Sequence, residues 1–257
     1  MTRFRQLFGD GKVLIGMIHL PPLPDYPGSP GLERIIEHAV EDAAALKSAG
    51  FDGVLLENEY DRPHRVKATP ETVYAMTMVT AAVVERSHDV RVGCEILLND
   101  PSASLDVVRA AGADFIRTDY FVDRMTRPEY GEFDIDPDGL IAYREQIGAG
   151  DVLILADIQV KYATMIEPRA LAESARIACE KGADAVVVSG DATGDAPRAE
   201  SLRDAAEGLP VLVGSGIAPA NAAELIDACD GAIVGTSLMK DRVVDLSRAI
   251  RLVESLS

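Results

Sequence analysis

A short segment that occurs four times along the chain constrains the fold more than any other feature. The copies begin at residues 49, 111, 181 and 228, and each leads from a helical pattern through an aspartate into a buried strand. In the first three copies a glycine precedes the aspartate and can adopt the left-handed conformation that ends helices. A second set of strands begins at residues 13, 90, 152 and 211 and alternates with the first. The chain therefore contains eight strands in a fourfold pattern, at a period typical of repeat architectures.

Helical spacing of apolar residues fills the stretches between these strands. The expected helices cover residues 33–49, 70–86, 102–111, 137–147, 168–181, 197–207, 219–229 and 241–256, and proline opens five of them. Strands that alternate with helices of this length pair in parallel, and eight such units close into a barrel. We expect an α/β fold, a single (β/α)8 TIM barrel over residues 1–257, with the residues before Lys12 forming a short cap over its bottom.

Composition excludes several classes of partner. The net charge of −17 argues against nucleic acid and anionic lipid, because both require a basic surface. The three cysteines are far apart and lie in apolar contexts, which is typical of free core thiols in a reducing compartment. No signal peptide and no apolar run of membrane-spanning length is evident. We therefore expect a cytoplasmic protein without membrane insertion.

Active sites of such barrels lie at the carboxyl ends of the strands. Aligning the repeats gives two sets of equivalent strand-end positions: Glu57, Asp119, Ser189 and Gly235 in one, and Ile18, Glu95, Asp157 and Gly216 in the other. Strands two to five thus end in carboxylates, whereas strands six to eight end in glycine, serine or threonine. This asymmetry suits a substrate with a phosphate at one end and a polar reacting part at the other.

The glycine-rich half predicts the phosphate site. Exposed backbone N–H groups followed by a helix N-terminus suit a phosphate, and the loops after the last two barrel strands are its usual place. The predicted phosphate-binding residues are Gly214, Ser215, Gly216, Asn221, Gly235, Thr236 and Ser237. Tight turns would also require small residues here, and Asn221 could cap its helix rather than contact a ligand.

The carboxylate half predicts the reacting groups. The candidate catalytic residues are His19, Glu57, Glu95, Asp157 and Lys161. The carboxylates could act as acid and base, hold a divalent cation through Glu95 and Asp157, or pair with an arginine. Arg117 should point into the barrel and needs a carboxylate, with Glu95 as the first choice. His19 could instead position its proline-rich loop, and Lys161 could neutralise a phosphate or act as a base. No nucleotide cofactor is expected, because a dinucleotide fingerprint is absent.

The stretch Gly16–Pro24, reading GMIHLPPLP and followed by Gly28-Ser29-Pro30, resembles the opening signature of the BtpA/SgcQ family. The segments Gly53–Asn58, Ser189–Gly194 and Gly231–Lys240 resemble that family as well. The resemblance implies a TIM barrel. It also implies relatives of two kinds: a cyanobacterial factor needed for photosystem I biogenesis or stability, and members in non-photosynthetic bacteria and archaea, some beside sugar-metabolism genes. It supplies no catalytic residues.

Three functions remain open. The first is an enzyme that acts on a small phosphorylated sugar or phosphoribosyl metabolite by lyase, isomerase or glycosyl-transfer chemistry. The second, implied by the resemblance, is a non-enzymatic assembly or stability factor, which predicts a large exposed apolar patch around Tyr120–Tyr130. The third is a ligand-regulated protein without turnover. The long loop Tyr120–Asp136 could form a lid or a subunit contact, and we expect a homo-oligomer.

Overall fold

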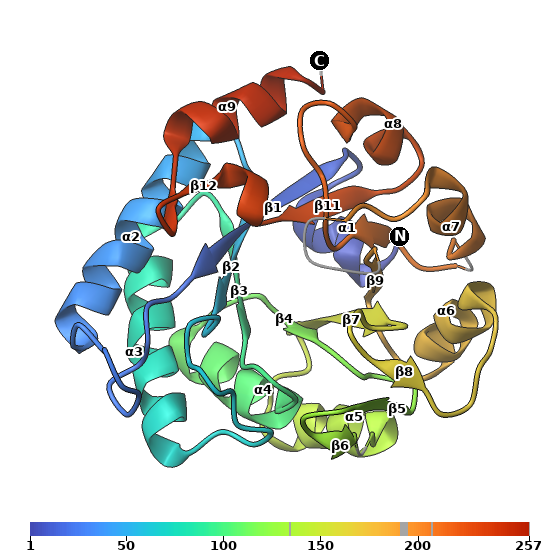
Figure 1. Ribbon diagram of the computed structural model, residues 1–257, viewed down its shortest axis with the longest axis horizontal. Coiled ribbons are helices and arrows are strands. Elements are labelled where there is room, and N and C mark those ends of the chain that lie inside the picture. The colour runs from blue at the N-terminus through green and yellow to red at the C-terminus, as the bar shows by residue number, and fades with distance from the viewer. Residues whose placement is uncertain (134, 191–194, 207, 257) are drawn as a thin grey trace.

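Eight parallel strands form a closed barrel, and the helices surround it as a ring (Figure 1). The computed structural model describes residues 1–133, 135–190, 195–206 and 208–256. Residues 191–194 of the family-like segment and Glu207 of the expected helix 197–207 lie outside this range. The barrel strands are β1 Val13–His19, β2 Gly53–Glu57, β3 Arg91–Glu95, β4 Phe115–Thr118, β7 Leu153–Ile158, β9 Ala185–Val188, β10 Val211–Val213 and β11 Gly231–Val234. They close in the order β1, β11, β10, β9, β7, β4, β3, β2, which confirms the predicted barrel.

The helices that follow these strands are α2 Leu32–Ala49, α3 Pro70–Arg86, α4 Pro101–Ala111, α5 Pro137–Gln146, α6 Leu171–Glu180, α7 Ala199–Asp204, α8 Ala222–Asp227 and α9 Leu246–Glu254. Proline occupies the first turn of α3, α4 and α5. By contrast, Pro168, Pro197 and Pro219 precede their helices by two or three residues. Around Pro219 the N–H groups of Asn221 and Ala222 both donate to the Ala218 carbonyl, so the chain forms a turn before α8 begins.

The repeated glycine–aspartate segment joins neighbouring strands. Its glycines, Gly50, Gly112 and Gly182, have φ angles of 93°, 71° and 85° at or just beyond the helix ends. Its aspartates each accept a backbone N–H from the strand that precedes them in the chain: Asp52 from Leu14 (2.8 Å), Asp114 from Val92, Asp184 from Ile154 and Asp230 from Val211 (2.9 Å each). The fourfold sequence repeat therefore encodes four clamps at the amino ends of the strands.

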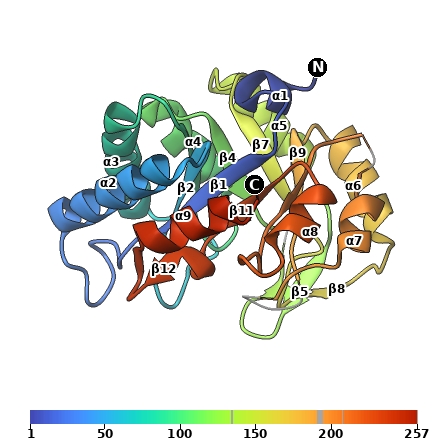
Figure 2. The same cartoon turned by 90° about the horizontal axis from the view of Figure 1, so that it is seen from above.

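The first helix, α1 Arg3–Phe8, closes the amino end of the barrel. Figure 2 shows α1 at one end and the segments labelled β5, β8 and β12 at the other. Phe4 is fully buried in the cluster inside the barrel, together with Val13 and Leu153, and the Phe8 ring meets the Phe115 ring edge-on at 5.8 Å. The predicted short N-terminal cap is confirmed.

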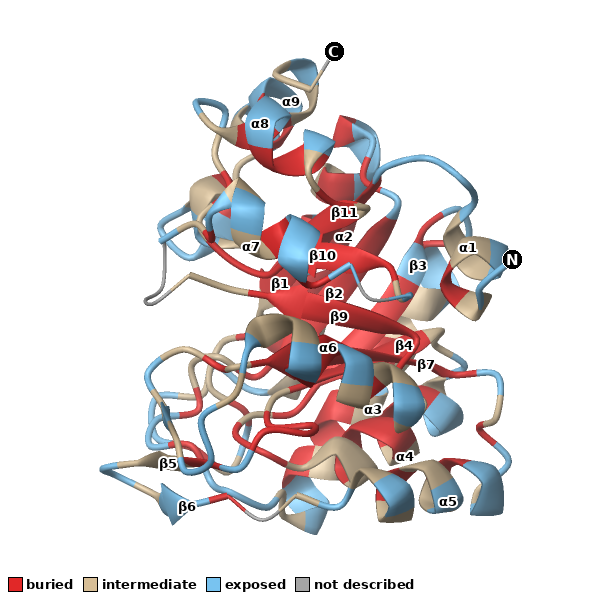
Figure 3. Cartoon of the chain, turned by 90° about the vertical axis from the view of Figure 1, so that its right-hand side faces the viewer, coloured by how far each residue is buried: buried red, intermediate tan, exposed pale blue. Residues whose placement is uncertain are grey.

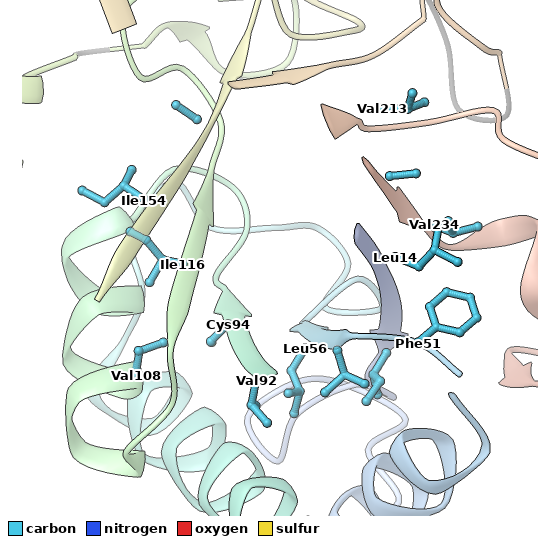
Figure 4. Packing of buried hydrophobic residues seen from close by; sticks show 14 of the residues in the cluster. Leu14, Phe51, Leu56, Val92, Cys94, Val108, Ile116, Ile154, Val213 and Val234 are labelled. Carbon is cyan, nitrogen blue, oxygen red and sulfur yellow. The ribbon is translucent and has the colours of Figure 1, made fainter. Parts of the chain in front are cut away.

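Alternation along the strands creates two cores, because successive side chains point to opposite faces. One set fills the barrel, for example Ile15, Leu155 and Val187. The other set packs between the strands and the helices, and Figure 4 shows part of it, including Leu56, Val92 and Ile116. In Figure 3 the barrel strands are mostly buried, whereas the helices are exposed on their outer faces. This alternation decides which strand-end residues face the inside of the barrel.

Among the described residues, three of the connections at the carboxyl end, those after β4, β7 and β11, carry structure of their own. The strands β5 Met125–Arg127, β6 Gly131–Glu132 and β8 Thr164–Met165 form a small antiparallel sheet. After β11 the chain forms a 3₁₀ turn, Thr236–Leu238, and the pair β12 Met239–Lys240 and β13 Val243–Val244. Five apolar residues of the connection after β4 are buried: Tyr120, Phe121, Val122, Met125 and Phe133. The segment Tyr120–Tyr130 therefore does not form the exposed apolar patch expected of an assembly factor.

Candidate active site

A cavity of about 610 Å³ lies at the carboxyl ends of the strands, within the roughly 300–1,000 Å³ common for small-molecule sites. Eleven of the thirteen residues predicted for the site line it: His19, Glu57, Glu95, Arg117, Lys161, Gly214, Ser215, Gly216, Gly235, Thr236 and Ser237. Asp157 and Asn221 do not. The acidic half and the glycine-rich half of the strand-end ring thus share one cavity.

Glu57 and Glu95 form a carboxyl pair at the base of this cavity. They lie side by side in the register of β2 and β3, and both side chains are buried. Burial, and then the charge of Glu59, raises the pKa of Glu57 to about 7, while burial raises the pKa of Glu95 well above its ordinary value. The pair therefore holds a proton near neutral pH, as general acid–base catalysis requires.

Arg117 lies inside the barrel, but its main partner is Asp157 rather than Glu95. Its Nε and terminal nitrogen donate to the two Asp157 carboxylate oxygens at 2.7 and 2.9 Å, whereas Glu95 Oε2 lies 3.7 Å from Nε. Both partners are on neighbouring strands, and only Asp157 meets the planar fork of the guanidinium with both oxygens. Asp157 is thereby withdrawn from the cavity, while Glu95 Oε2 has no hydrogen-bond partner within the described residues.

His19, not Ile18, is the member of the strand-end ring on β1. In the register of the sheet His19 pairs with Glu57, and its Nε2 lies 3.5 Å from Glu57 Oε2. Ile18 is fully buried on the outer side of the barrel. Gly16 and Gly93, which occupy equivalent places in the repeats, face opposite sides of the sheet: a side chain at Gly16 would clash with Leu46 of α2, whereas one at Gly93 would clash with Phe115 inside the barrel.

The environment of His19 keeps its imidazole neutral. Burial lowers its pKa to about 4. The ring packs against Gly235, where an added Cβ would lie only 3.3 Å from Nε2. A neutral imidazole has one donor and one acceptor nitrogen, so His19 can form a hydrogen bond with the Glu57 carboxyl group or with a ligand.

Asp119 is a cavity residue that the sequence-based site omitted. It lines the cavity, and burial, together with the charges of Glu95 and Asp157, raises its pKa well above the ordinary value. Its place in the repeat alignment was the available signal, because it is equivalent to Glu57. Further lining residues come from loops that carry no repeat signal: Glu59, Tyr60, Arg62, His64, Arg127, Tyr162, Met239 and Arg242.

The glycine-rich wall comes from the connections after β10 and β11. Among the described residues, no acceptor is found for the backbone N–H groups of Gly216 and Ser237, or for the buried Ser237 hydroxyl. Thr236 is exposed at the same wall. The Ser215 hydroxyl, in contrast, donates to the Asp195 carbonyl (2.8 Å) and accepts from the Gly190 N–H (3.0 Å), so it holds the neighbouring connection.

Two of the residues predicted to bind phosphate, Gly216 and Asn221, determine the local backbone structure. Gly216 has φ +72°, and a Cβ there would clash with the backbone of Asp195 and Ala196, so close packing of two connections requires the glycine. Asn221 accepts the Ala218 N–H (2.8 Å) and donates to the Gly216 carbonyl (3.0 Å). Its side chain fixes the turn that presents Gly216 and does not line the cavity.

A cation site at Glu95 and Asp157 finds no support in this geometry. Both Asp157 oxygens bind Arg117, and within the described part of the chain no group of three or more His, Cys, Asp or Glu residues could hold a metal ion. In that same part, no helix combines the length and the apolar character needed to cross a membrane.

Solved structures of other proteins share the fold at low sequence identity. Thiamine phosphate pyrophosphorylase from Pyrococcus furiosus superposes with a TM-score of 0.61 at 19% identity, over 98% of this chain and 97% of that one. 3-Hexulose-6-phosphate synthase superposes with a TM-score of 0.60 at 17% identity, over 95% and 100%. These likenesses support the barrel assignment.

Sequence relatives cover nearly the whole chain. A protein of Archaeoglobus fulgidus is 36% identical over 95% of this chain and 98% of its own length. The photosystem I biogenesis protein BtpA of Synechocystis is 34% identical over 98% and 90%, and the sgc region protein SgcQ of Escherichia coli is 30% identical over 100% and 98%. The model of the BtpA family matches residues 10–257. The protein is therefore a member of the BtpA family.

Proposed function

We propose that this protein is an enzyme that acts on a small phosphorylated sugar or phosphoribosyl metabolite. One observation carries the proposal: a single cavity joins the buried, proton-holding pair Glu57–Glu95 to a glycine-rich wall whose N–H groups at Gly216 and Ser237 have no acceptor among the described residues. A ligand that fills this cavity meets a phosphate-type site at one end and an acid–base group at the other.

The phosphate belongs at the wall formed after β10 and β11. Unpaired backbone N–H groups are strong donors to an anion, and barrels commonly bind phosphate in the loops after these two strands. The buried Ser237 hydroxyl supplies another donor that lacks a partner within the described residues. Donors left unsatisfied in a buried site are costly unless a ligand satisfies them.

The reacting part of the substrate belongs over Glu57 and Glu95. With a pKa of about 7, Glu57 can accept or return a proton at neutral pH. The neutral imidazole of His19 and the cationic Lys161 line the same cavity and can stabilise charge that develops on a carbonyl or hydroxyl oxygen. Isomerase, lyase and glycosyl-transfer steps all use such a proton transfer.

The comparisons support the substrate class without fixing it. Two structures of the same fold are of proteins whose names include a phosphorylated molecule, thiamine phosphate and 3-hexulose-6-phosphate. The relative BtpA of Synechocystis is instead named for photosystem I biogenesis. For this chain the buried state of Tyr120, Phe121 and Val122 favours an enzyme over an assembly factor that docks through that segment.

A thermal-shift assay of the whole chain tests the proposal. Inorganic phosphate, ribose 5-phosphate and fructose 6-phosphate are compared with ribose and fructose. At a ligand concentration about 100-fold above Kd, binding to the folded state should raise Tm by about 5–10 °C. The substitution Ser237→Asp places a carboxylate at the proposed phosphate position and should abolish the shift, whereas Ser48→Asp, exposed on α2, adds the same charge elsewhere and should not. No shift with any phosphorylated compound, or an unchanged shift in Ser237→Asp, would contradict the proposal.

A further inference from the structure

Three cations in the cavity have no carboxylate partner in the part of the chain that the structure describes. Arg127, Lys161 and Arg242 line it, and none of them forms an ion pair with another residue in the described ranges. The other two lining arginines differ, since Arg62 pairs with Glu59 and Arg117 with Asp157. In a protein with a net charge of −17, three uncompensated cations around one cavity indicate that an anion completes it.

The cavity carboxyl groups compensate these cations only in part. Burial raises the pKa of both Glu57 and Glu95, so the pair retains a proton and carries at most one negative charge at neutral pH. Burial disfavours the charged form of Asp119 as well. The lining therefore has an excess of positive charge at neutral pH.

The cations lie on both sides of the barrel mouth. Arg127 belongs to β5, in the connection that follows β4, whereas the glycine-rich wall and Arg242 follow β10 and β11. In the closed order of eight strands β4 and β11 are four places apart, so their carboxyl ends lie across the barrel from each other. Lys161 follows β7, the neighbour of β4, and belongs to the Arg127 side.

Each side is held in place by aromatic contacts and by unusual backbone. The Arg127 guanidinium lies 5.8 Å from the Tyr130 ring and 5.9 Å from the Tyr162 ring, and its buried Nε has no acceptor within the described residues. Arg242 stacks over Tyr60 at 4.5 Å. Tyr162 and Arg242 have φ angles of 61° and 68°, which cost free energy in residues other than glycine and tend to persist at binding sites.

We propose that the ligand of this cavity is a sugar bisphosphate. One phosphate would occupy the glycine-rich wall beside Arg242, the second would meet Arg127 and Lys161 across the mouth, and the carbon skeleton would lie between them over Glu57. The inference rests on the proposed function for the first phosphate and adds the second. It also explains why Arg127 reaches the cavity while Arg124, in the same connection, is exposed and paired with Glu132 and Glu167.

Calorimetric titration with two matched pairs of probes tests the inference: fructose 6-phosphate against fructose 1,6-bisphosphate, and ribulose 5-phosphate against ribulose 1,5-bisphosphate. In at least one pair the bisphosphate should bind tenfold or more tightly. Arg127→Gln and Lys161→Gln should each weaken bisphosphate binding by about 10–100-fold, the range for a charge-assisted contact, and monophosphate binding by less than about threefold. Arg127→Lys should retain part of the difference in affinity between the bisphosphate and the monophosphate. Arg124→Gln, which removes a charge from the same connection, is the control and should leave it unchanged.

The outcomes separate the two proposals. If mono- and bisphosphates bind equally, and Arg127→Gln and Lys161→Gln leave both affinities unchanged, the bisphosphate inference is overturned and the phosphate site at the glycine-rich wall stands. If neither the sugar phosphates nor inorganic phosphate bind at millimolar concentration, both proposals fail. Equal weakening of both ligands by Arg124→Gln and Arg127→Gln would also overturn the inference, because the effect would then come from the connection and not from the contact.

Discussion

The proton held between Glu57 and Glu95 links the stability of the protein to pH. Glu57 has a pKa of about 7 in the folded state against an ordinary value of 4.5. Between these values the folded state binds more protons than the unfolded state, so the free energy of unfolding falls as pH rises through this window. A shift of this size corresponds to a loss on the order of 3 kcal/mol above pH 7.

Replacing the carboxyl group should flatten this dependence. We expect the free energy of unfolding of Glu57→Gln to fall less between pH 5 and pH 8 than that of the native sequence, because glutamine stays neutral throughout. Urea unfolding at the two pH values measures the difference. Glu37→Gln, exposed on α2, is the matched control, and its free energy of unfolding should depend on pH as that of the native sequence does. If the free energy of unfolding of Glu57→Gln falls between pH 5 and pH 8 as much as that of the native sequence, the pKa of Glu57 is not raised by folding.

Gly216 should tolerate no side chain. Gly216→Ala forces a Cβ into the backbone of Asp195 and Ala196 at a φ of +72°, so we expect a loss of roughly 2–4 kcal/mol in the free energy of unfolding. Gly11→Ala, where an added Cβ meets nothing within 4 Å, should change it by less than about 0.5 kcal/mol. Denaturant unfolding of both variants checks the pair, and similar values for the two would contradict the packing described at Gly216.

At the scale of elements, the repeats predicted the eight strands because an aspartate clamp recurs at the amino end of each of the four strand pairs. Helix starts were predicted less well where a connection forms a turn first, as it does around Pro219. The small sheet of β5, β6 and β8 was not predicted. Its strands are two or three residues long, and β5 pairs with β8 across a separation that no local pattern reveals. Such pairing depends on tertiary contacts that the sequence pattern does not display.

The N-terminal helix should be a substantial source of stability. Phe4 is completely buried inside the amino end of the barrel, so Phe4→Ala should lower the free energy of unfolding by about 3–5 kcal/mol. Gln6→Ala, exposed on the same helix, should have an effect within about 0.5 kcal/mol. Chemical denaturation provides the measurement, and a loss below about 1 kcal/mol for Phe4→Ala would mean that α1 is not an integral part of the barrel.

At the scale of the whole molecule, the equivalence of the repeats was enough to predict that the acidic and glycine-rich residues share one end of the barrel. It did not predict how charges pair there, because Arg117 could reach either Glu95 or Asp157 and the choice depends on side-chain geometry. The sequence also did not predict that three residues from long connections line the cavity: Tyr60, Arg127 and Arg242. They reach the cavity from long connections whose paths are set by buried contacts such as the stacked rings of Tyr120 and Phe133, 4.0 Å apart.

The proposed function places a phosphorylated ligand in the strand-end cavity, with its phosphate at the wall formed after β10 and β11. The most direct test is a crystal structure of the whole chain with the sugar phosphate that gives the largest thermal shift. We expect a phosphate within hydrogen-bonding distance of the N–H groups of Gly216 and Ser237, and the sugar over Glu57. A sugar phosphate bound elsewhere on the molecule, or a phosphate directed away from this wall, would contradict the proposed function.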